Sequence, residues 1–136
     1  MKKTYRGSCH CRRVTFEVDL DLEAEGTGKC NCTVCWKRRA WSTRVKPDSF
    51  RALTGEAEMR RYPDNQVVEG GGFCPTCGVA PFLRIAAQEW NDGASVSVNV
   101  ACLDDLEPQE LIAAPVQYFD GRNDNWWQPP SETRHL

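Results

Sequence analysis

Cys30-Asn31-Cys32-Thr33-Val34-Cys35 places three thiols within six residues. Thiols this close together can hold one metal ion from three sides. A zinc ion in a protein usually binds four ligands in a tetrahedron, so three cysteines leave one position to fill. If another residue of the chain fills it, the site is structural; if water or a substrate fills it, the site is open for catalysis.

The composition limits the classes of protein to which this chain can belong. Its 136 residues are enough for one domain with a modest core. Its 17 basic and 19 acidic side chains give a formal net charge of −2, which provides no general attraction for nucleic acid or for an anionic membrane surface. We therefore expect neither nucleic acid nor a membrane as a partner.

The chain contains eight cysteines, which indicates either a disulfide framework or metal sites. The positively charged start, residues 1–7, is not followed by the apolar run of a secretory signal. No run of roughly 20 apolar residues is present to span a membrane. We therefore expect a cytoplasmic protein, and in that reducing compartment clustered cysteines are more often metal ligands than disulfides.

Alternating apolar and polar residues favour a β-rich fold. Residues 13–18 and 94–100 alternate most clearly. A short helical turn is expected to begin among the three cysteines, with Thr33 as candidate N-cap. We predict a mainly β fold, a single small domain (residues 1–136) of antiparallel sheets with short helical turns. Weaker patterns predict strands at residues 43–45, 50–53, 59–62 and 79–85, loops or turns at 19–28, 63–65, 88–93 and 118–127, and a turn or short helical segment at 106–111.

Two further cysteine pairs supply a second candidate metal site. In an extended segment, residues two apart share a face, so Cys9 and Cys11 would point together while His10 points away as a spacer. Cys74-Pro75-Thr76-Cys77-Gly78 is a C-x2-C knuckle, in which the proline presets the turn and the glycine tolerates a positive φ. Four thiolates complete the shell of a structural zinc. Since Cys74 comes 63 residues after Cys11, such a zinc would staple the first strand to a distant hairpin.

The neighbours of the three-cysteine stretch leave two questions open. Residues 37–39 are all basic, and they would either attract an anionic ligand or form a solvated basic turn. Trp36 and Trp41 would either form an apolar wall around the metal or pack in the core, and the core is the more common place for tryptophan. Cys102 follows a predicted strand and is either a buried apolar residue or the fourth ligand of the three-cysteine site.

Three motifs, taken in order, resemble those of a known family. They are Gly7-Ser8-Cys9-His10-Cys11, Cys30-x-Cys32-x2-Cys35 and Phe73-Cys74-x2-Cys77-Gly78. They are similar to the motifs of the glutathione-dependent formaldehyde-activating enzyme family, which includes centromere protein V. The segment from Asp120-Gly121 to Trp126 resembles the C-terminal end of the family more weakly. The resemblance covers about residues 3–127. Asn31 and Trp36 depart from residues common in the family, and Trp36 bears on which substrate fits.

The resemblance implies two zinc ions and a fold in which zinc ties antiparallel sheets together. One zinc would be structural and the other catalytic, with an open position. The structural ligands implied are Cys9, Cys11, Cys74 and Cys77, and the catalytic ligands implied are Cys30, Cys32 and Cys35.

The chemistry implied is that of a carbon–sulfur lyase. A thiol such as glutathione would bind at the open position, lose its proton and attack an aldehyde carbon, and the reverse reaction would cleave the S-hydroxymethyl adduct. Neither His10 nor His135 is well placed as a general base. The candidates to pair the carboxylates of a glutathione-like ligand are Lys37, Arg38, Arg39 and Arg44.

Two other classes of function compete with this interpretation. One is a non-catalytic, zinc-stabilised protein-binding module in which both zincs are structural. The other is a thiol-based redox or metal-handling protein. The fourth ligand of the three-cysteine site separates enzyme from module: an exogenous ligand supports the enzyme, and Cys102 supports the module.

Overall fold

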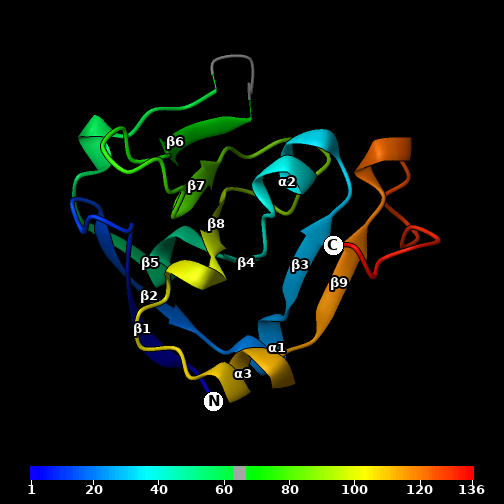
Figure 1. Cartoon of the computed structure of the whole chain (residues 1–136), viewed down its shortest axis with the longest axis horizontal. Coiled ribbons are helices and arrows are strands. Elements are labelled where there is room, and N and C mark those ends of the chain that lie inside the picture. Colours follow the sequence, from blue (N-terminus) through cyan, green and yellow to red (C-terminus); the bar gives the residue numbers. More distant parts are fainter. Residues whose placement is uncertain (63–66) are drawn as a thin grey trace.

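Two β-sheets form the protein, and both appear in Figure 1. The computed structural model describes residues 1–62 and 67–136. One sheet has three strands in the order β1-β2-β5, and the other has six in the order β6-β7-β8-β4-β3-β9. The strands are β1 (Lys3–Ser8), β2 (Thr15–Leu20), β3 (Thr27–Cys30), β4 (Ser42–Val45), β5 (Phe50–Thr54), β6 (Val68–Gly72), β7 (Phe82–Ile85), β8 (Ser95–Asn99) and β9 (Val116–Phe119).

The helices are short. They are α1 (Leu22–Glu25), α2 (Thr33–Arg38) and α3 (Pro108–Ala113), with single 3-10 turns at Pro47–Ser49, Glu56–Glu58, Val100–Cys102 and Gly121–Asn123. Among the described residues, no helix is both long enough and apolar enough to cross a membrane. The predicted mainly β fold is confirmed, and nearly all neighbouring strands are antiparallel, as expected. The exception is β3 against β9, which run parallel.

The core lies between the two sheets, where alternating apolar side chains meet. Phe16 on β2 and Phe50 on β5 contact Phe82 on β7, with ring centroids 5.7 and 4.6 Å apart. All three rings are buried, and burying each contributes about 1.5–3 kcal/mol. Gly7 on β1 lies opposite Phe16, and a Cβ there would come within 2.1 Å of that ring, so glycine is required for this packing.

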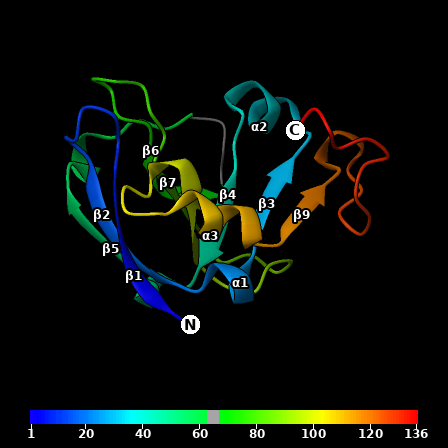
Figure 2. The same ribbon diagram turned by 60° about the horizontal axis from the view of Figure 1, so that its bottom comes forward.

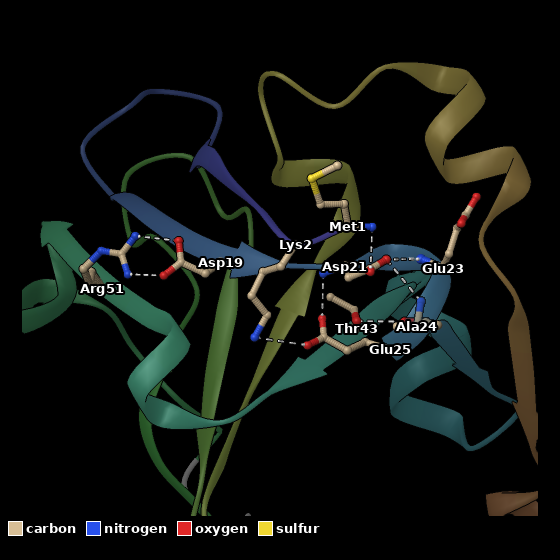
Figure 3. Close-up of polar contacts among 10 residues, drawn as sticks. Met1, Lys2, Asp19, Asp21, Glu23, Ala24, Glu25, Thr43 and Arg51 are labelled. Atoms are coloured by element: carbon tan, nitrogen blue, oxygen red, sulfur yellow. Dashed lines mark hydrogen bonds and ion pairs between the residues drawn. The ribbon is translucent and has the colours of Figure 1, made fainter.

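The loop predicted over residues 19–28 is wrong. The structure has the end of β2, helix α1 and strand β3 there. Asp21 caps α1 by accepting hydrogen bonds from the Glu23 and Ala24 amides, and Glu25 accepts one from the Asp21 amide (Figure 3). These local polar contacts favour a helical turn without an apolar periodicity. The Met1 amino group, 2.8 Å from Asp21, holds the start of the chain against this corner.

Other differences from the predictions lie outside the core. The tail expected as loop contains β9, and the strand expected at residues 59–62 is reduced to one bridge between Arg60 and Phe73. Cys32, not Thr33, is the N-cap of α2. The turn predicted at residues 63–65 lies outside the described residues. The helical turn predicted to begin among the three cysteines is confirmed as α2, and the short helical segment predicted at residues 106–111 is confirmed as α3.

Candidate metal centres and substrate cavity

The four cysteines assigned to a structural zinc converge in space. The sulfur of Cys11 lies 3.7 Å from that of Cys9 and 3.7 Å from that of Cys74, and Cys77 completes the group. Four sulfurs around one zinc, each bonded at about 2.3 Å, lie about 3.8 Å apart. The arrangement therefore fits zinc, and all eight cysteines of the chain are free thiols.

Turns, and not a strand, bring Cys9 and Cys11 together. The extended segment predicted there is wrong: β1 ends at Ser8, the Arg12 amide donates to the Cys9 carbonyl at 3.2 Å, and Arg12 has a φ of 65°. The knuckle at the other pair forms as predicted. Gly78 has a φ of 80°, and its amide donates to the Cys74 carbonyl at 2.7 Å.

Backbone amides prepare the sulfurs of Cys74 and Cys77 to carry negative charge. The N–H groups of Cys11 and Val79 lower the pKa of the Cys77 thiol to about 6, and those of Cys77 and Thr76 lower the pKa of Cys74. The thiolate is the form that binds zinc. A metal held here would join the end of β1 in the small sheet to the β6–β7 hairpin in the large one.

The three remaining motif cysteines form a second cluster, with their sulfurs within 4.8 Å of one another. Cys30 ends β3, Cys32 caps α2 and Cys35 lies in its first turns. Burial raises the pKa of the Cys35 thiol to about 12 and also raises the pKa of Cys30. Burial alone would raise the pKa of Cys32 too, but hydrogen bonds from its neighbours, Cys35 above all, outweigh burial and lower that pKa. A divalent cation favours the thiolate form of every ligand that it binds, so these three clustered sulfurs fit zinc as well.

A polar network behind this cluster fixes its loop. The Asn31 side-chain amide donates to Asp120 Oδ1 at 2.8 Å, and Asn31 Oδ1 accepts from the Arg122 amide at 2.9 Å. Both Asn31 and Asp120 are buried, and hydrogen bonds from Asn31 and Asn123 lower the pKa of Asp120. Asn31, which departs from the residues common in the family, therefore links the cysteine loop to the segment after β9.

Cys102 lies at the other cluster. It is buried, and burial together with the charge of Asp104 raises the pKa of its thiol to about 12, with smaller effects from Cys9 and Cys77. It belongs to neither set of clustered sulfurs. Among the described residues, no fourth His, Cys, Asp or Glu joins Cys30, Cys32 and Cys35.

A cavity of about 70 Å³ opens beside the three-cysteine cluster. Its lining combines two sulfurs, two indole rings and two cations. Trp36, expected in the core, is 37% exposed at this cavity, whereas Trp41 packs against the core and also lines the cavity. The lining residues are Lys29, Cys30, Cys35, Trp36, Arg39, Ala40, Trp41 and Leu136.

The basic residues proposed from the sequence are spread over different surfaces. Arg39 lines this cavity, whereas Arg38 lines a second, smaller cavity with Arg60 and Arg61. Lys37 and Arg44 line neither cavity. The remaining cation of the cavity, Lys29, was not predicted, although its position directly before Cys30 was a usable signal.

Arg122 was also missed. Its guanidinium lies 5.0 Å from the Trp36 ring centre and donates to the Asn31 carbonyl at 3.1 Å. No sequence pattern links Arg122 to the cysteines, because the contact depends on how β9 returns beside β3.

Comparison with known proteins agrees with these features. A crystal structure of a Rhodobacter sphaeroides protein is similar, with 25% identity and a TM-score of 0.63 over 82% of this chain and 99% of the other. The sequence model of the glutathione-dependent formaldehyde-activating enzyme family matches residues 4–121. The match covers most of the chain and all seven clustered cysteines. The chain therefore belongs to the glutathione-dependent formaldehyde-activating enzyme family.

Proposed function

We propose that this protein is a carbon–sulfur lyase-type enzyme that acts on the adduct of a thiol such as glutathione with an aldehyde. The observation that carries the proposal is the incomplete three-cysteine cluster beside a cavity, which Cys102 does not complete. In this proposal Cys9, Cys11, Cys74 and Cys77 hold a structural zinc, and Cys30, Cys32 and Cys35 hold a catalytic one.

The reaction needs one bond to form and one proton to move. The sulfur of the thiol bonds to the aldehyde carbon, and the thiol proton ends on the aldehyde oxygen to give the S-hydroxymethyl product; cleavage reverses both changes. When bound, zinc supplies the positive charge that favours the thiolate form of a thiol at the open position.

The cavity walls would position the substrate. Trp36 and Trp41 present apolar faces beside Cys30 and Cys35, which limits water around the reacting sulfur. Lys29 and Arg39 place two cations on the same cavity, and these suit the two carboxylates of glutathione. Of the four basic residues predicted from the sequence, Arg39 is therefore the one that this proposal retains in the substrate site.

Two variants test the proposal directly. Exchange between free and thiol-bound formaldehyde, followed by NMR with glutathione, should exceed the spontaneous rate with the wild-type protein. Cys32→Ser should abolish the excess, because it removes a ligand of the open site, whereas Cys102→Ala should retain it. Wild-type exchange no faster than the spontaneous rate would refute the proposal.

The protein-binding module is the weaker alternative. It required Cys102 to close the three-cysteine site, and Cys102 lies at the other cluster. A cytoplasmic location belongs to the same proposal, because a reducing compartment keeps clustered thiols available to metal.

A further inference from the structure

The last six residues of the sequence fold back onto the cavity. Figures 1 and 2 both show the C-terminus beside β3. The Lys29 ammonium donates to the main-chain oxygen of Leu136 at 3.1 Å, and Arg39 Nη1 donates to the carbonyl of His135 at 2.6 Å. The His135 ring also packs on Trp36, with centroids 4.5 Å apart. Residues 131–136 thus contact three of the side chains that line the cavity.

The two cations are held there by main-chain oxygens of the segment, Arg39 by the neutral carbonyl of His135 and Lys29 by the oxygen of Leu136. Within residues 1–62 and 67–136, neither Lys29 nor Arg39 forms an ion pair with an Asp or Glu side chain. A carboxylate adds a full negative charge to a hydrogen bond from a cation, and it can accept two parallel N–H bonds from one guanidinium. A ligand that brings carboxylates into the cavity therefore offers Arg39 a better partner than the His135 carbonyl, and it competes with the Leu136 oxygen for Lys29.

Few other contacts bind this segment to the body of the protein. Its ion pair joins Arg134 to Glu132, both inside the segment, and the Leu136 amide bonds to the Thr133 carbonyl. The match to the family ends at residue 121, so the segment is outside the region that the family shares.

We propose that residues 131–136 are an intramolecular ligand of the cavity, which a carboxylate-bearing thiol displaces from Lys29 and Arg39. The inference rests on the proposed function, since it concerns access to the same site. Competition of this kind weakens the apparent affinity of the cavity for the thiol. The apparent dissociation constant is the intrinsic one divided by the fraction of molecules in which the cavity is free. If that fraction is about one in ten, removing the competitor tightens binding about tenfold.

Hydrogen exchange of the full-length, zinc-loaded protein tests the displacement without any turnover. The probe is S-methylglutathione, which keeps both carboxylates but has no free thiol. Exchange in the peptide that covers residues 128–136 should rise when the probe is added. If the segment is instead a wall of the occupied cavity, exchange will slow. Slower or unchanged exchange at the highest attainable probe concentration would overturn the inference.

Calorimetric titration of variants supplies the second readout. His135→Ala removes the contact with Trp36 and should tighten binding of S-methylglutathione severalfold, and a chain that ends at Pro130 should tighten it further. Glu132→Gln is the matched control, since its ion pair stays inside the segment, and it should bind like the wild type. Weaker binding by His135→Ala would overturn the inference. Normal displacement without formaldehyde exchange would refute only the lyase proposal.

Discussion

Gly121 gives the sharpest steric test of the three-cysteine site. It follows the buried Asp120 and opens a 3-10 turn beside the cluster. A Cβ at this position would lie 2.7 Å from Cys30 Sγ and 2.8 Å from the indole of Trp126. The backbone there is not in the left-handed region, so the effect of Gly121→Ala is steric and not conformational.

The size of the effect follows from these distances. Non-bonded atoms rest about 3.5–4.0 Å apart, so Cys30 Sγ or the turn must move by about 1 Å. Zinc sites tolerate about 0.2 Å in their bond lengths, and disturbing the supporting shell of a metal site typically costs 10- to 100-fold in affinity. We expect Gly121→Ala to weaken zinc at Cys30, Cys32 and Cys35 by about that factor, or about 1.4–2.7 kcal/mol.

Competition with a chromogenic chelator measures this loss. One of the two zinc ions should transfer to the chelator at a lower concentration than in the wild type, and the other should be unaffected. Gly28→Ala is the matched control, because its Cβ would meet the Phe119 ring at 3.0 Å and no sulfur. Unchanged affinity for both zinc ions in Gly121→Ala would refute the steric reasoning.

Three further predictions concern the fold and its support of the site. Phe82→Ala should lower the free energy of unfolding in urea by about 3–5 kcal/mol, since the ring is fully buried; a loss under about 1 kcal/mol would contradict the packing. Asn31→Ala removes one of the two side chains that donate to the buried Asp120 and should cost about 1–3 kcal/mol while weakening one zinc ion in the chelator assay; equal weakening of both would contradict it. The Arg51 guanidinium lowers the pKa of Asp19 to about 2, below its unfolded value, so the pair stabilises the fold above about pH 4 and less as the pH falls toward 2. Because the pair is solvated, Asp19→Asn should cost only about 0.2–1 kcal/mol at pH 7, and the difference from wild type in urea unfolding should shrink between pH 6 and 3; a constant difference would contradict it.

Local chemistry made the grouping of the candidate metal ligands predictable. Spacing alone grouped Cys30, Cys32 and Cys35, and the knuckle at Cys74 and Cys77 carries its own turn residues. The pairing of Cys9 and Cys11 was predicted for the wrong reason, because a turn and not a strand brings their sulfurs together. A metal site depends on the positions of the sulfur atoms, and different backbone conformations can bring those atoms to the same positions.

Contacts between distant segments were not predictable. Strand β9 is short and pairs in parallel with β3, from which it is distant in the sequence (Thr27 lies opposite Val116), and neither segment shows alternation on its own. The approach of Arg122 and of residues 131–136 to the cavity follows from that pairing. The sequence therefore predicted which cysteines cluster at the candidate site, but not the cation Lys29 or the contacts of residues 131–136 with the cavity lining.

X-ray absorption at the zinc edge tests the central claim most directly, because it counts the sulfurs bound to zinc. Seven clustered cysteines shared by two ions give an average of about 3.5 sulfurs per zinc. We predict this value without added thiol, and an increase to about 4 with glutathione, in both the wild type and Cys102→Ala. A value of about 4 before glutathione is added, falling in Cys102→Ala, would mean that the chain closes its own site and would contradict the account.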